Sequence, residues 1–190
     1  MFKKCFFAAL VGCILLSSAV IRSHGRYQVA QQQLAQHSYS AWGALHSLAH
    51  EAGYYETLTD LSNSNYSARH NAIVHYGVTP HLTPSFDSGT SGFLYSDMWP
   101  FLNLLVQADP DHTITQRSFQ LFQDLSEEIE KISAFVIEYA NQGMAEKVEL
   151  IDRNSEVYQQ VNEQIAACID TYLEDILFLT PRLSNIVENP

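Results

Sequence analysis

Residues 121–139 read LFQDLSEEIEKISAFVIEY, and this stretch decides the fold class of the chain. Its apolar residues recur at steps of three and four, which is the spacing that keeps side chains on one face of an α-helix. These residues are Leu121, Leu125, Ile129, Ile132, Val136 and Tyr139. Polar and charged residues fill most of the positions between them. The pattern therefore predicts a long amphipathic helix over residues 114–142.

The same spacing resumes after Gly143, but it is out of phase with the helix before it. The second series consists of Val148, Ile151, Tyr158, Val161, Ile165, Cys168, Tyr172, Ile176 and Leu179. Because the phase slips at Gly143, we predict a second helix over residues 144–180, which begins after a tight turn and ends at Pro181. A connection this short makes the two helices antiparallel neighbours.

A third long helix is expected before this pair. Residues 27–62 contain no Pro and repeat apolar residues at helical spacing. Residues 63–113 lose this period, so we predict an irregular, partly helical insert with a short strand over residues 71–78 and a short helix over residues 99–108. The expected fold is mainly all-α: an elongated bundle of three long helices, with the insert between helix 1 (residues 27–62) and helix 2 (residues 114–142), and helix 3 over residues 144–180.

The N-terminus has the pattern of a targeting signal. Lys3 and Lys4 precede the uncharged run CFFAALVGCILLSSAVI at positions 5–21. A basic start followed by an apolar run is typical of a secretory signal, and small residues favour cleavage after Ala19. The run is also long enough to remain as a membrane anchor. Two further alternatives are a lipoprotein modified at Cys13, which the sequence LVGC favours, and a buried helix of a cytosolic protein.

We therefore expect residues 1–21 to be a signal peptide or an N-terminal anchor, and residues 22–190 to form one helical domain. The protein is expected to be exported to the periplasm or another extracytoplasmic site, with residues 5–21 in the inner membrane if they are not cleaved. Cleavage would leave Cys168 as the single cysteine, and its position in a helical repeat predicts a small core residue. A net charge of −11 argues against nucleic acid as a partner.

Six of the eight histidines fall between residues 37 and 81. His46 and His50, in the stretch ALHSLAHEAGYY, stand one helical turn apart and would supply two ligands to a metal ion. His70 and His75 in the insert complete the candidate set for zinc or another divalent transition metal. The alternatives are a pH-sensitive face of His and Tyr side chains, and histidines without a shared function.

Recognisable catalytic motifs are absent from the sequence. The zinc-protease pattern H-E-x-x-H fails after His50, because Tyr54 occupies the position of the second histidine. The stretch GTSGF at positions 89–93 ends in Phe instead of Gly, so it is not a nucleophile elbow. We therefore expect a binding protein and not an enzyme, with no cofactor unless a metal is bound.

Aromatic residues gather in the insert and on the first helix beside the histidine pair. On a helical wheel, His46 and His50 lie to one side of the apolar stripe, so their face is either exposed or covered by the insert. The small residues Gly43 and Gly53 favour coverage by the insert. The side chains expected to contact a partner are Tyr39, Tyr54, Tyr76, Phe93, Tyr95 and Trp99. The partner is expected to be another envelope protein or a second copy of the chain.

In the order of its expected elements, the chain resembles the minor pilus subunits of type IV secretion systems, and helical sensor domains share the long first helix that leaves a membrane. Both resemblances concern element order only and assign no residue. The expected function is that of an exported, non-catalytic helical binding or assembly protein of the bacterial cell envelope, acting through its aromatic, His-rich insert. A periplasmic metal-binding or pH-sensing module that uses His46 and His50 is the alternative.

Overall fold

The computed structural model describes residues 2–77 and 88–189, except for the side chains of residues 2–19, 21, 74–77, 88 and 91. All of the elements in the described ranges are helices and none is a strand, so the predicted all-α class is confirmed. The helices are α1 (Phe2–Ala52), α2 (Leu58–Asn63), α3 (Tyr66–Gly77), α4 (Ser88–Gly92), the π-helical turn η1 (Phe93–Met98), α5 (Trp99–Leu105), α6 (Thr113–Ala140), α7 (Met144–Glu149) and α8 (Glu156–Glu188).

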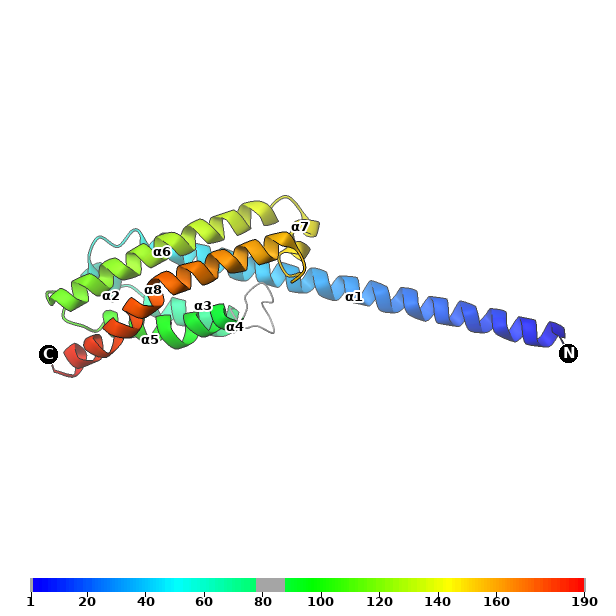
Figure 1. Ribbon diagram of the computed structural model, residues 1–190, viewed down its shortest axis with the longest axis horizontal. Helices are drawn as coiled ribbons and strands as arrows, with labels where there is room; N and C mark the ends of the chain where they lie inside the picture. Colours follow the sequence, from blue (N-terminus) through cyan, green and yellow to red (C-terminus); the bar gives the residue numbers. More distant parts are fainter. Residues whose placement is uncertain (1, 78–87, 190) are drawn as a thin grey trace.

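The longest element, α1, is one continuous helix of 51 residues. At 1.5 Å per residue this corresponds to roughly 75 Å. Its C-terminal part packs into the bundle, where Trp42, Leu45 and Ala52 are buried. Its N-terminal part projects alone from one end of the bundle (Figure 1). Within the part of the chain that the structure describes with side chains, no helix is long and apolar enough to cross a membrane.

The first predicted helix is divided in two, because α1 ends at Ala52 and α2 follows after a turn. Thr57 caps α2: its hydroxyl accepts a hydrogen bond from the N–H of Asp60 (3.2 Å). The Asp60 carboxylate in turn accepts from the N–H of Thr57 (3.1 Å). This capping box begins a new helix inside the predicted one, and it directs Leu58 and Leu61 into the core.

The described part of the predicted irregular insert is largely helical. The strand predicted over residues 71–78 is wrong, because α3 extends to Gly77. This helix buries Tyr66 and His70 and half-buries Ile73. Their spacing of four and three is helical, but a histidine among them hides the period from a count of apolar residues. The short helix predicted near the end of the insert is present as α5.

The two later long helices are present, but the second of them is interrupted. α6 matches its prediction to within two residues at each end, and the chain breaks near Gly143 as the phase slip predicts. The helix predicted over residues 144–180 is split by a turn in which the N–H of Ser155 donates to the carbonyl of Asp152 (2.9 Å). The Ser155 hydroxyl then caps α8 by accepting from the N–H of Tyr158 (3.1 Å).

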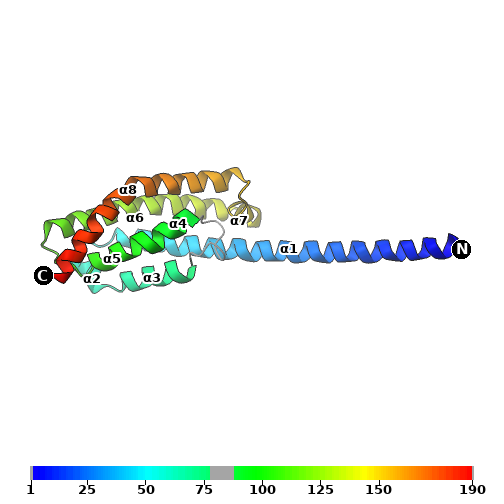
Figure 2. The same cartoon turned by 60° about the horizontal axis from the view of Figure 1, so that its bottom comes forward.

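The prediction that Pro181 ends the last helix is wrong, because α8 continues to Glu188. Proline has no N–H, so the carbonyl of Leu177 loses its helical partner. Leu177 is 54% exposed, on the solvent side of α8, where water can hydrate this carbonyl. On the inner side, Leu179 and Leu183 are fully buried. Their packing offsets the missing hydrogen bond, and α8 bends along its length (Figure 2).

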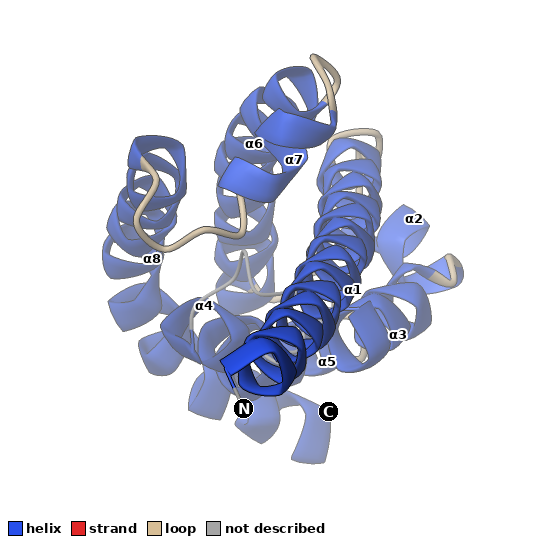
Figure 3. Cartoon of the chain, turned by 90° about the vertical axis from the view of Figure 1, so that its right-hand side faces the viewer, coloured by secondary structure: helices blue, strands red, loops and turns tan. Residues whose placement is uncertain are grey.

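The long helices and the insert enclose a single core. Seen from the N-terminal end, α6 lies between α8 and α1, and α4 and α5 close the opposite side (Figure 3). α6 runs antiparallel to α8, as predicted, and also to α1 (Figure 1). The largest fully buried side chains are Trp42, Leu61, Tyr66, Phe101, Leu102, Leu105, Phe122, Leu125, Ile176, Leu179 and Leu183. Because they come from all of these layers, the insert is part of the core and not an appendage.

Candidate functional site

The histidine pair of α1 faces α6. The Nδ1 atom of His46 lies 3.1 Å from the hydroxyl of Ser133, and Nδ1 of His50 lies 2.7 Å from a carboxylate oxygen of Glu130. The two imidazole rings are nearly parallel, with their centroids 6.1 Å apart. The expectation that the insert covers this face is therefore wrong, because the partners come from α6.

His50 is hydrogen-bonded at both ring nitrogens. Its Nε2 atom lies 2.8 Å from the hydroxyl of Tyr54, one turn further along the chain. Because a carboxylate only accepts hydrogen bonds, Nδ1 must donate to Glu130, and Nε2 of the neutral ring then accepts from Tyr54. Tyr54 is 69% exposed, so this chain of hydrogen bonds is open to water.

The predicted metal ligands are only partly brought together. His46 and His50 lie side by side, but His70 packs against Trp99 in another part of the bundle, and the side chain of His75 lies outside the described residues. Among the described side chains, no group of three or more His, Cys, Asp or Glu residues is placed to hold a metal ion. A pair of imidazoles supplies half of a tetrahedral zinc site.

Three of the predicted partner-contacting residues have structural roles. Phe93 is buried in the core, and Trp99 is half-buried, with its ring parallel to that of His70. The hydroxyl of Tyr39 donates to the side chain of Asn141 (2.8 Å), which ties α1 to the end of α6. The ammonium of Lys147 lies 4.2 Å from the centroid of the Tyr39 ring and ties α7 to the same point.

The other predicted contact residues do not form one patch with them. Tyr54 and Tyr95 are exposed, at 69% and 49%, on α1 and η1 respectively. The side chain of Tyr76 lies outside the described residues. Of the six aromatic side chains, only these two are therefore placed by the described structure to meet a partner with much of their surface.

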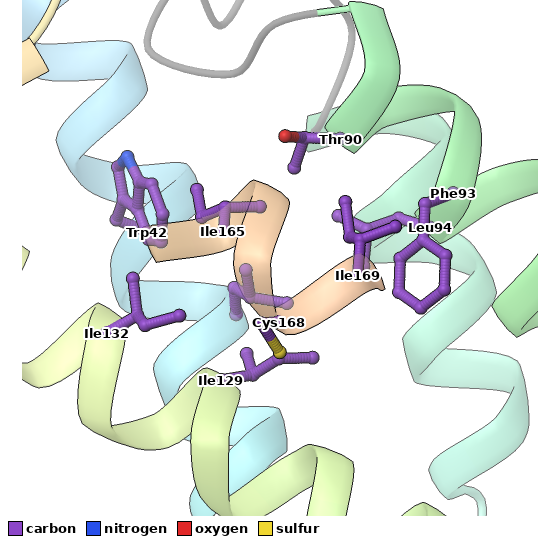
Figure 4. A pocket seen from close by; sticks show the side chains of 10 residues that line it. Trp42, Thr90, Phe93, Leu94, Ile129, Ile132, Ile165, Cys168 and Ile169 are labelled. Carbon is purple, nitrogen blue, oxygen red and sulfur yellow. The ribbon is translucent and has the colours of Figure 1, made fainter. Parts of the chain in front are cut away.

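An apolar cavity of about 30 Å³ lies where α1, α4, η1, α6 and α8 meet (Figure 4). Its walls are Trp42, Leu45, Thr90, Phe93, Leu94, Ile129, Ile132, Ile165, Cys168 and Ile169. An apolar cavity that binds benzene measures about 150 Å³, so this one is too small for a ring-sized ligand. Cys168 packs against the core, as predicted, and is half-buried. Burial raises the pKa of its thiol to about 11, which keeps it protonated and unreactive at neutral pH.

An ion pair between α1 and α3 was not among the predicted site residues. The guanidinium of Arg69 pairs with the carboxylate of Glu51, and the hydroxyl of Tyr55 donates to the same carboxylate oxygen (2.5 Å). The hydrogen bond from Arg69 is the main cause that lowers the pKa of Glu51. Sequence spacing gave no signal for this pair, because its members lie on two helices separated by a turn and by α2.

Charge is divided sharply along the chain. The first 50 residues hold four of the ten Lys and Arg residues and none of the 21 Asp and Glu residues, for a net charge of +4. The remaining 140 residues hold six bases and all 21 acids, for a net charge of −15. The projecting part of α1 is therefore basic and the bundle is acidic. Val20, Tyr27 and Val29 are exposed large hydrophobic residues on this part of α1.

No family model matches the chain, and no curated protein or solved structure matches it either.

Proposed function

We propose that the protein is an exported, membrane-tethered and non-catalytic helical binding or assembly protein of the bacterial cell envelope. The observation that carries the proposal is the course of α1, which passes without a break from the uncharged residues 5–21 into the core of the bundle. A single helix in both places would hold the bundle at a fixed distance from a bilayer that contains its N-terminal end.

The division of charge supports this arrangement. Arg22 and Arg26 directly follow the apolar run, and no acid precedes Glu51. Anionic lipid headgroups would attract this basic part of α1 and repel the acidic bundle, so electrostatics favours a bundle that stands away from the membrane. Tyr27 is exposed on the same part of α1, and Tyr side chains favour the boundary between lipid and water.

Partner binding is proposed on the bundle, through the insert. Among the described aromatic side chains of the insert, Tyr95 of η1 is exposed, and Tyr54 on α1 is exposed as well. Exposed tyrosines supply contact area at low cost in side-chain entropy, which is why they are frequent at interfaces. The partner is another envelope protein or a second copy of the chain.

Membrane fractionation tests the tether. Expressed in a bacterium, the full chain should remain in membranes after an alkaline carbonate wash. A double variant, Leu15→Arg/Leu16→Arg, places two charges in the apolar run, each of which costs about 2.5–3.5 kcal/mol at the centre of a membrane-spanning helix. It should move most of the protein to the soluble fraction. Gln32→Arg, on the exposed part of α1 beyond the run, is the matched control. A wild-type chain that washes off like the double variant would refute the tether.

A second candidate function is favoured by a separate observation. The hydrogen bond between His50 and Glu130 links α1 to α6, and protonation of the ring would turn it into an ion pair. This supports the alternative of a pH-sensing module based on the His46/His50 pair. It requires the α1–α6 contact to depend on pH in the wild type and to lose that dependence in a His50→Gln variant.

A further inference from the structure

His70 is a titratable side chain in the interior of the bundle. It lies on the inner face of α3 and is 1% exposed. Its ring is nearly parallel to the indole of Trp99 in α5, with the centroids 6.4 Å apart. The ring of Tyr66, one turn earlier in α3, lies 6.3 Å away. His70 therefore lies at the contact that attaches α3 to the rest of the insert.

Neither ring nitrogen of His70 has a hydrogen-bond partner among the residues that the structure describes. A neutral imidazole carries one N–H donor and one acceptor nitrogen, so both are removed from water without compensation. A second proton would place a full positive charge at the same position, at a much greater cost. Burial accordingly lowers the pKa of His70 to about 4, from an ordinary value of 6.5.

Within residues 2–77 and 88–189, the elements that pack against α3 supply no counter-charge to this ring. On α1, Glu51 is already paired with Arg69 of α3. On η1 the acidic group is Asp97, whose own pKa is raised by burial. α5 has the sequence WPFLNLL and carries no titratable side chain. Burial is the one cause found for the lowered pKa of His70, so none of these charges offsets the desolvation of an imidazolium.

The rest of the α3 attachment stays intact while His70 gains its proton. The hydroxyl of Tyr66 donates to the backbone carbonyl of Leu48 in α1 (3.0 Å), and this bond does not titrate in acid. The pKa of Glu51 is lowered, so its pair with Arg69 persists as the pH falls through the range in which a free histidine becomes charged. Between about pH 6.5 and pH 4, His70 is therefore the group that weakens the attachment.

We propose that protonation of His70 detaches α3 from α1 and α5, and so exposes the aromatic side of the insert in acid. The faces uncovered include Tyr66 and Trp99, which pack against Phe122 and His70 at neutral pH. Detachment adds Tyr66 and Trp99 to the surface that the insert offers to a partner, so this added surface is present only in acid. The consequence for binding rests on the proposed function, whereas the detachment itself does not.

Amide hydrogen exchange over residues 66–73 of the full chain, corrected for the intrinsic effect of pH on exchange, measures the detachment. We take the pKa of His70 as about 4 when α3 is packed and as 6.5 when α3 is detached. The equilibrium constant for detachment of α3 is then about thirtyfold greater at pH 5 than at pH 8. A His70→Phe variant keeps an aromatic ring beside Trp99 but cannot be protonated. Its α3 should open less at pH 8 and show no rise at pH 5. His37→Gln, which removes an exposed histidine of α1 to which no role is assigned, should retain the thirtyfold rise.

Equal opening of wild-type α3 at pH 5 and pH 8 would overturn the proposal, and so would a rise that persists in His70→Phe. If His70→Phe does not fold, His70→Leu replaces it with a smaller side chain and the same expectation. Membrane fractionation of the same samples is independent of α3. A chain that washes off membranes but opens α3 in acid would refute the tether alone, and the reverse result would refute the acid response alone.

Discussion

Glu51 illustrates how a single residue gains its role from partners that are distant in the sequence. Its carboxylate forms an ion pair with Arg69 of α3 and accepts a hydrogen bond from the hydroxyl of Tyr55, in the turn after α1. Both contacts favour the charged form, and together they outweigh burial, so the pKa of Glu51 is lowered. A group whose folded-state pKa is lowered stabilises the fold above its ordinary pKa, and this contribution is lost as the pH falls through the folded-state value.

We expect Glu51→Gln to lower the free energy of unfolding by about 1 kcal/mol at pH 7, because a partly exposed pair contributes about that much. The difference from the wild type should shrink as the pH falls from the ordinary pKa of a glutamate through the lowered folded-state value, because the wild-type carboxylate becomes protonated over this range. Urea unfolding at pH 7 and at pH 3 measures both values. Glu56→Gln, at an exposed position, is the control and should have little effect at either pH. A loss that is equal at both pH values would contradict the ion-pair account.

The contacts of the histidine pair on α1 could not be predicted from the sequence around them. The helical wheel placed His46 and His50 to one side of the buried stripe of α1, on a face that was expected to be exposed or covered by the insert, whereas both contact α6. Their partners Ser133 and Glu130 lie 87 and 80 residues away in the sequence, so no local pattern pointed to them. His70 was predicted as a ligand because of its residue type, whereas its described contacts are with aromatic rings.

At the scale of elements, predictability depended on how completely a helix shows its apolar face in the sequence. α6 was predicted nearly to its ends, because it has one apolar face and a polar one. α3 was missed because its inward residues include Tyr66 and His70, which a count of aliphatic residues omits. The course of α8 through Pro181 could not be predicted either, since buried Leu179 and Leu183 outweigh the local preference.

The division between α1 and α2 leads to a test at this scale. Thr57 and Asp60 form the capping box that begins α2, so Thr57→Ala should lower the free energy of unfolding by about 1 kcal/mol. Thr59→Ala is the matched control, because Thr59 is exposed and lies within the helix. Thermal unfolding of the two variants compares them directly. Equal stability would mean that the capping box does not determine where α2 begins.

At the scale of the whole molecule, α1 connects two parts of opposite charge. Its projecting part is basic and begins with the apolar residues 5–21, whereas the bundle carries a net charge of −15 from residue 51 onward. The sequence shows the apolar run directly, and its helical periodicity predicted the bundle. It did not predict that the same helix would continue through both, because the residues between them are polar and Gly25 lies among them.

The most direct test of the tether is a spin-label scan along α1 of the full chain in lipid bilayers. Single labels placed one at a time from residue 5 to residue 34 report their access to oxygen, which enters the bilayer, and to a water-soluble nickel complex. If residues 5–21 tether the protein, labels at these positions will favour oxygen and labels at residues 22–34 will favour the nickel complex. Residues 5–21 that remain accessible to the nickel complex in the presence of lipid would contradict it.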